Sequence, residues 1–142
     1  MAHYFITGAS SGIGAALAVQ LTAAGHQVSA VARRQQRLAA LSKQLGSFHG
    51  FTADVGDAAS LSTAIDKAKA KSGAIDVAIL NAGIYQPQDG TKIDPQIYAN
   101  HMTINYLGVV NALAVSCLIW FAKAKAILPL CHQLRGGVDC RN

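Results

Sequence analysis

The stretch from Thr7 to Gly14, Thr-Gly-Ala-Ser-Ser-Gly-Ile-Gly, has the residue types and spacing of a phosphate-binding turn. It follows a short apolar run and leads directly into a helical pattern, and this order of strand, glycine turn and helix creates an anion site. Gly8 allows a sharp exit from the strand, and Gly12 lacks the Cβ that would keep a diphosphate away from the backbone. Gly14 lets the helix pack closely on the sheet. A glycine-rich turn without a ligand is the alternative.

Ser10, Ser11 and Ile13 belong to the same candidate binding set because they border the start of the helix. Free N–H groups of a first helical turn, together with the positive end of the helix dipole, attract an anion. The glycine spacing is G-x-x-x-G-x-G, which differs from the general dinucleotide fingerprint G-x-G-x-x-G. The turn alone therefore indicates a phosphate ligand without naming it.

Two arginines follow the second apolar run of the chain, where the sequence reads Ala32-Arg33-Arg34. In a dinucleotide-binding sheet this position separates NAD from NADP, because a carboxylate there bonds the ribose hydroxyls and repels a 2′-phosphate. No acid lies nearby, and a guanidinium offers a planar set of donors that suits a phosphate. We therefore interpret Arg33, supported by Arg34, as a clamp for the 2′-phosphate of NADP(H). The alternative is the ordinary start of an exposed helix.

Two further clusters follow the third and fourth apolar runs. Asp54 has a carboxylate that can accept from an adenine amino group, and Val55 would line the adenine pocket. Asn81, Ala82 and Gly83 let the backbone pass beside a ribose, and the Asn81 side chain can hold the strand through bonds to the backbone. Each cluster alone is equally consistent with an ordinary turn. Together they fall where a ligand lies in such a sheet, over the carboxyl ends of the strands.

The opening turn, Asp54-Val55, Asn81-Ala82-Gly83 and the run Ile104-Asn105-Tyr106-Leu107-Gly108 together resemble the short-chain dehydrogenase/reductase family in order and spacing. The resemblance covers about residues 1–115. It implies an NADP(H)-linked oxidoreductase that transfers hydride between the nicotinamide and a carbonyl or alcohol carbon of a small-molecule substrate. It also implies that Asn105 holds a water in a proton relay. The alternative for this residue is a bond to the backbone of its own helical turn.

The catalytic part of the family pattern is missing from the 142 residues. Family members pair a strand serine with a Tyr-x-x-x-Lys motif, in which the lysine charge lowers the tyrosine pKa. None of the four tyrosines has a lysine four positions later. Nothing after Ala122 reads as a further strand ending in serine, so we expect the sheet to be truncated after about four strands. The fourth strand would then have an uncovered edge, and we expect a homo-oligomer unless the tail covers it.

The chain divides into a dinucleotide-binding domain, residues 1–115, and a divergent tail, residues 116–142. All three cysteines and the one tryptophan lie in the tail, and residues 131–142 have neither helical nor strand periodicity. A frameshift, alternative splicing or a gene-model error near residue 115 would explain this change. We expect the 142-residue chain to bind the cofactor weakly and to be inactive. The alternative is a natural, non-catalytic NADP(H)-binding or regulatory module.

These clusters require strands that alternate with helices, and the sequence predicts that alternation. The expected strands are continuous apolar runs at 3–7, 27–32, 48–53 and 75–80. The expected helices are 12–24, 33–45, 57–71 and 95 to at least 114, with Ile13, Leu17 and Leu21 as the apolar row of the first. Asp57 and Asp94 are the expected N-caps of the last two helices, and Gly73 is expected to follow the third. Strands that are apolar throughout are buried on both faces. The pattern therefore predicts an α/β fold, a doubly wound parallel (Rossmann) sheet in the order 3-2-1-4.

The amino-acid composition excludes several other classes of protein. Hydrophobic residues make up 51% and charged residues 13%, as in one folded domain and not in a disordered or nucleic-acid-binding chain. The net charge of +5 comes from cations spread over predicted helices, which indicates a solvated surface.

The apolar stretch 107–122 is shorter than a membrane span of about 20 residues. A membrane-surface protein anchored there is a further hypothesis. The first strand begins near Met1, which leaves no room for a signal peptide, and the cysteines lack metal-site spacing. We expect a cytoplasmic protein with no metal site.

Overall fold

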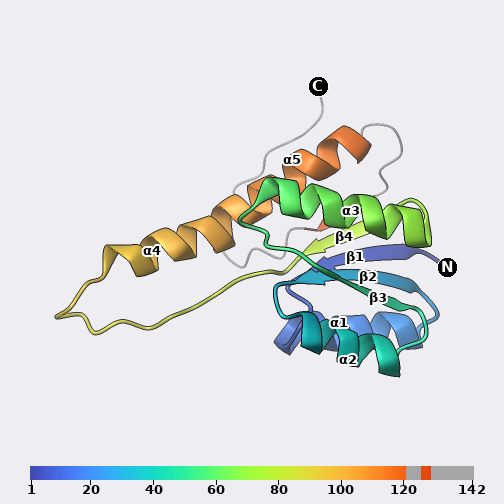
Figure 1. Cartoon of the computed structure of the whole chain (residues 1–142), viewed down its shortest axis with the longest axis horizontal. Helices are drawn as coiled ribbons and strands as arrows, with labels where there is room; N and C mark the ends of the chain where they lie inside the picture. The colour runs from blue at the N-terminus through green and yellow to red at the C-terminus, as the bar shows by residue number, and fades with distance from the viewer. Residues whose placement is uncertain (121–125, 129–142) are drawn as a thin grey trace.

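The computed structural model describes residues 1–120 and 126–128 (Figure 1). Its centre is a sheet in the order β3-β2-β1-β4-β5, in which every neighbouring pair is parallel. The strands are β1 (His3–Thr7), β2 (Gln27–Ala32), β3 (Phe48–Thr52), β4 (Val77–Leu80) and β5 (Ala126–Leu128). The predicted order 3-2-1-4 of the first four strands is confirmed.

The expectation that no strand follows residue 122 is wrong. Ala126–Leu128 form β5, which pairs with β4 in the register Val77 with Ala126 through Ile79 with Leu128. This run has three residues, too short for apolar periodicity to distinguish it from a loop. Because β5 covers the β4 edge along those residues, the predicted uncovered edge is also wrong there. The aperiodic stretch predicted at residues 131–142 lies outside the described residues.

Helices cover both faces of the sheet, as the doubly wound prediction requires. In Figure 1, α1 and α2 lie on one face, and α3 and α5 lie on the other. The helices are α1 (Gly12–Ala23), α2 (Gln35–Gln44), α3 (Ala58–Ser72), α4 (Pro95–His101) and α5 (Gly108–Trp120), with a π-helical segment η1 (Met102–Leu107) between the last two. Adjacent residues of β1 pack on opposite faces of the sheet: Phe5 packs with α3 and α5, and Ile6 packs with α1 and α2.

Capping residues explain where several of these helices begin and end. The side chain of Asp57 accepts hydrogen bonds from the amides of Ala59 and Ser60 at the start of α3, and Asp94 accepts one from Gln96 at the start of α4. Gly73 follows α3 with a φ of 80°, a conformation that favours glycine. These predicted ends are confirmed.

The predicted apolar row of α1 is only partly buried. Leu17 and Leu21 pack against the core, whereas Ile13 is 64% exposed. Ile13 lies in the first turn of α1 and borders the cavity described below. Its place in the helical row therefore did not predict its burial.

The predicted long helix from Pro95 is present as α4, η1 and α5 in unbroken succession. Met102 and Gly108, at the two junctions, both have right-handed helical backbone angles. The π-helical segment was not predicted, because a wider helical turn leaves no mark in the apolar pattern. In the described part of the chain, no helix has the length and apolar character to span a membrane.

Candidate functional site: a cleft over the strand ends

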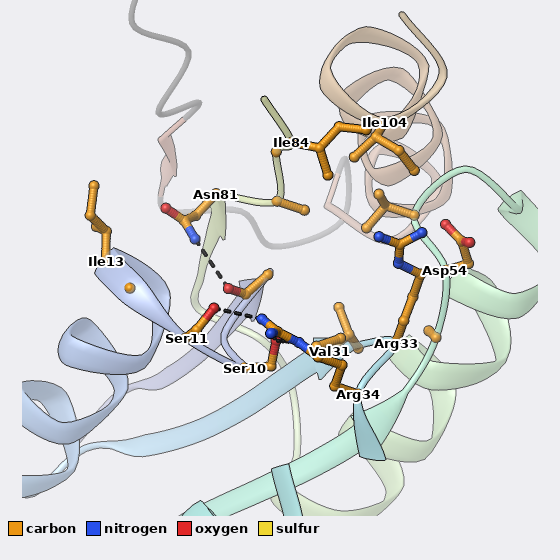
Figure 2. Close-up of a pocket in the computed structure, with 17 residues that line it drawn as sticks. Ser10, Ser11, Ile13, Val31, Arg33, Arg34, Asp54, Asn81, Ile84 and Ile104 are labelled. Atoms are coloured by element: carbon orange, nitrogen blue, oxygen red, sulfur yellow. Dashed lines mark hydrogen bonds between the residues drawn. The ribbon is translucent and has the colours of Figure 1, made fainter. Parts of the chain in front are cut away.

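A cavity of about 850 Å³ lies at the carboxyl ends of β1, β2, β3 and β4 (Figure 2). Every predicted binding residue except Gly14 lines it. The lining residues are Gly8, Ser10, Ser11, Gly12, Ile13, Val31, Ala32, Arg33, Arg34, Ala53, Asp54, Val55, Asn81, Ala82, Gly83, Ile84 and Ile104. Clusters that are far apart in the sequence thus meet around one space, as expected for the strand ends of a doubly wound sheet.

The turn after β1 requires glycine at two positions. Gly8 has a φ of 73°, and a Cβ added there would lie 2.6 Å from the Cα of Ala82. A Cβ on Gly14 would lie 2.6 Å from both the Nδ2 atom of Asn81 and the carbonyl oxygen of Gly8. The start of α1 therefore packs directly on the end of β4, and Gly14 supports the cavity from behind.

Gly12 is different, because a Cβ there would meet no protein atom within 4 Å. Its φ is 58°, and it borders the cavity. Ser11, the N-cap of α1, makes no side-chain hydrogen bond to the first-turn amides, and that turn carries no acidic residue. A helix start with uncapped amides next to open space fits a diphosphate. The residues present thus suit a dinucleotide cofactor.

Asn81 joins the ends of β1 and β4. Its Nδ2 group donates to the carbonyl oxygens of Thr7 and Gly8 at 3.3 and 3.4 Å. In return, the Ala82 amide donates to the Thr7 hydroxyl at 3.0 Å. The predicted locking role of Asn81 is confirmed, and it fixes the Ala82-Gly83 backbone beside the glycine turn.

The two arginine side chains extend in different directions. Arg34 donates from Nη2 to the hydroxyl oxygens of Ser10 at 2.9 Å and Ser11 at 2.6 Å, and from Nε to Ser10 at 3.2 Å. Figure 2 shows the Arg33 side chain extending instead toward Asp54. Both guanidinium groups line the cavity at the end of β2. Arg34, predicted only to support Arg33, is therefore the arginine that contacts the glycine turn.

Asp54 and Val55 form a turn that is held from two sides. One Asp54 carboxylate oxygen accepts from the Gly56 amide at 2.9 Å, so the ordinary turn role of this residue is present. The Val55 carbonyl oxygen accepts from Nδ2 of Asn111 at 2.9 Å. A Cβ on Gly108 would lie 2.7 Å from Val55 Cγ2. Asn111 and Gly108 thus position the predicted adenine wall.

Sequence reasoning did not assign these roles to Asn111 and Gly108. The only signal was a polar residue and a glycine inside an otherwise apolar helical stretch. It also missed the apolar lining from Ile84 and Ile104.

Asn105 does not line the cavity. Its Oδ1 atom accepts from the Ile84 amide at 2.7 Å, and its Nδ2 group donates to the Ile84 carbonyl oxygen at 2.9 Å. The alternative of a bond to its own helical turn is therefore wrong: the side chain attaches η1 to the segment after β4. The proton-relay role that the resemblance implies stays a prediction. No group of three or more His, Cys, Asp or Glu side chains in the described part of the chain is arranged to hold a metal ion.

Comparison with known proteins identifies the family of this chain. A family model described as short chain dehydrogenase matches residues 2–125. D-threitol dehydrogenase from Mycolicibacterium smegmatis is 36% identical over 133 residues, which cover 90% of this chain and 51% of that protein. A probable NADP-dependent dehydrogenase from Dichelobacter nodosus is 45% identical over 80 residues, covering 56% of this chain and 76% of that one.

Solved structures have the same fold. A short-chain type dehydrogenase/reductase from Mycobacterium marinum superposes with a TM-score of 0.82 at 24% identity, over 90% of this chain and 54% of that one. The chain spans about half the length of this structure and of the threitol dehydrogenase.

Proposed function

This chain belongs to the short-chain dehydrogenase family, and we propose that its cavity binds NADP(H) for hydride transfer between the nicotinamide and a carbonyl or alcohol carbon of a small molecule. When bound, the cofactor supplies the hydride or accepts it. The chain's own residues supply binding and orientation. In this proposal the open first-turn amides of α1 hold the diphosphate, and Asn81 fixes the backbone that passes the ribose.

The choice of NADP(H) over NAD(H) depends on one observation, the two guanidinium groups at the end of β2. Arg33 and Arg34 both line the cavity, and Arg34 also bonds the two serines of the glycine turn. No carboxylate occupies that strand end, where one would repel a 2′-phosphate. The printed name of the Dichelobacter relative, an NADP-dependent dehydrogenase, supports the same choice.

The adenine is proposed to lie against Val55, which is 8% exposed and held in place by Asn111. Asp54 keeps one carboxylate oxygen in its turn, which leaves the other as the acceptor for the adenine amino group. In this proposal Asn105 acts near the nicotinamide end as the proton-relay residue, next to Ile84.

Fluorescence titration tests the proposal, because reduced nicotinamide emission responds to burial. We expect NADPH to bind at least about tenfold more tightly than NADH. A tenfold difference corresponds to about 1.4 kcal/mol of binding free energy, which charge-assisted contacts to the 2′-phosphate can supply. Arg34→Ala should reduce this preference in part, because Arg33 remains at the end of β2, and Arg37→Ala, on the exposed surface of α2, serves as the control. Equal affinity for the two coenzymes would remove the basis for choosing NADP(H).

Turnover is a separate question. None of the four tyrosines has a lysine four positions later, and we propose that the 142 residues bind the cofactor without turning over substrate. The proposed boundary at residue 115 and its origin by frameshift are tested by translating the other two reading frames downstream. Finding no serine followed by Tyr-x-x-x-Lys in either frame would favour the second candidate, a non-catalytic NADP(H)-binding or regulatory module.

Self-association is also proposed, although β5 covers part of the β4 edge. Large apolar side chains remain exposed along α4, η1 and α5, including Tyr98, Met102, Tyr106 and Val110. Exposed apolar side chains gathered on one helix are typical of an interaction surface. Sedimentation velocity should show a concentration-dependent dimer or larger species, and a monomer at all concentrations would contradict this part of the proposal.

A further inference from the structure

The free edge of the sheet at β3 presents unpaired backbone groups. Ser47 accepts from the Val28 amide at 2.9 Å, and the Ala53 amide donates to Ala32 at 3.3 Å, so the odd-numbered residues of this segment face β2. The N–H and C=O groups of Gly50 and Thr52 must therefore point away from the sheet. Within residues 1–120 and 126–128, no turn, loop or side-chain hydrogen bond reaches them. Both residues are exposed.

A groove follows this edge. Two adjoining hollows of about 480 and 320 Å³ lie between α2 and α3, and both include Ser42, Gly50 and Phe51. The α2 wall of the larger hollow is mainly small or apolar, with Leu38 and Ala39. The groove thus has exposed strand backbone along its floor and a helix on each side.

The α3 wall is positively charged. Lys67 lines the larger hollow and Lys71 lines the smaller one, and among the residues that the structure describes no carboxylate lines either hollow. Burial, and next the charge of Lys71, lowers the pKa of His49, which lies on the same edge. Lys69, between the two lysines in sequence, instead pairs with Asp66 at 3.3 Å.

We infer that this groove binds an extended acidic peptide segment of another protein as an added strand beside β3. An extended peptide can satisfy the backbone groups of Gly50 and Thr52. Lys67 and Lys71 are four residues apart, about 6 Å along the helix, and alternate strand residues are about 6.7 Å apart. Two carboxylates at alternate positions of the peptide therefore match the two lysines, while the intervening small apolar side chains face α2.

A second copy of the chain is a poorer occupant. Two copies meeting at this edge bring the same lysines together, and each chain carries a net charge of +5. Like charges that face one another across an interface disfavour the pairing. Charge complementarity therefore selects an acidic partner.

NMR of the ¹⁵N-labelled full chain tests the inference, with a capped peptide of alternating Glu and Val as the probe. We expect the largest shifts along β3 and slowed amide exchange at Gly50 and Thr52. The double variant Lys67→Gln/Lys71→Gln should bind about tenfold more weakly, the size expected for two partly exposed charge contacts. The matched control Lys69→Gln/Lys92→Gln removes the same charge elsewhere and should bind as the wild type does.

Three results would overturn the inference. The first is unchanged exchange at Gly50 and Thr52 in wild-type protein saturated with the peptide, a readout that needs no variant to fold. The second is equal binding of a peptide with Lys in place of Glu. The third is protection of the same two amides that rises with protein concentration in the absence of peptide, since a second copy would then be the occupant.

Discussion

Replacing Gly12 with alanine should weaken NADPH binding much more than it destabilises the fold. Gly12 has a φ of 58° and open space where a Cβ would lie, at the border of the cavity. An alanine in the left-handed conformation costs about 1–2 kcal/mol, and no clash adds to this. In the complex, however, the new methyl group would lie where the diphosphate approaches the backbone, and we expect an affinity loss of about tenfold or more.

Gly25→Ala provides the matched control. Gly25 has a φ of 82° and likewise no neighbour within 4 Å of its missing Cβ, but it follows α1 at the opposite end from the cavity. The backbone strain is therefore similar, about 1–2 kcal/mol, and no ligand is near. Gly8→Ala is the opposite case, because the added Cβ would lie 2.6 Å from the Ala82 backbone. Overpacking should lower the free energy of unfolding of this variant by about 1–3 kcal/mol more than in the other two variants.

Urea denaturation and NADPH titration of the three variants separate the two effects. The expected pattern is similar stability for Gly12→Ala and Gly25→Ala, with only Gly12→Ala defective in binding. If the two variants bind NADPH equally well, the diphosphate does not lie against the Gly12 backbone and the reasoning is refuted.

Three further predictions concern single side chains. Arg33→Ala should lower NADPH affinity by about 1–3 kcal/mol and leave NADH affinity level in the same titration, and an equal loss for both would exclude a 2′-phosphate contact. Asn111→Leu should lower the free energy of unfolding by about 1–3 kcal/mol in urea, because the Val55 carbonyl oxygen loses its partner; unchanged stability would show that water replaces the amide. His49 has a folded pKa below 6.5 through burial and Lys71, so the unfolded chain takes up its proton first. Stability should therefore fall as the pH drops through 6.5, and His49→Gln should flatten this fall; identical pH profiles would contradict the assignment.

The sequence was sufficient for those parts of the fold that local patterns determine. Buried strands left continuous apolar runs, and Asp57 and Asp94 marked helix starts because a cap depends on neighbours in the sequence. The strand order followed from right-handed crossovers. β5 was not predicted because three residues are too few to show the apolar pattern of a strand, and this segment is a strand only through its pairing with β4.

The site was predictable as a set of positions and not as a set of contacts. Placing each cluster after a strand brought it to the correct edge, so all but one of the predicted binding residues line the cavity. The bonds of Arg34 to Ser10 and Ser11, and of Asn105 to Ile84, span more than 20 residues. Such pairings depend on how the elements pack, and no local spacing encodes them.

The most direct test of the central claim, that the first turn of α1 holds the diphosphate of NADP(H), is an NMR titration of the ¹⁵N-labelled chain with NADP⁺. We expect the amide signals of Gly12, Ile13 and Gly14 to shift most among the backbone amides, with smaller changes at Arg33 and Arg34. Saturation with NADP⁺ that leaves these five amides unmoved would contradict it.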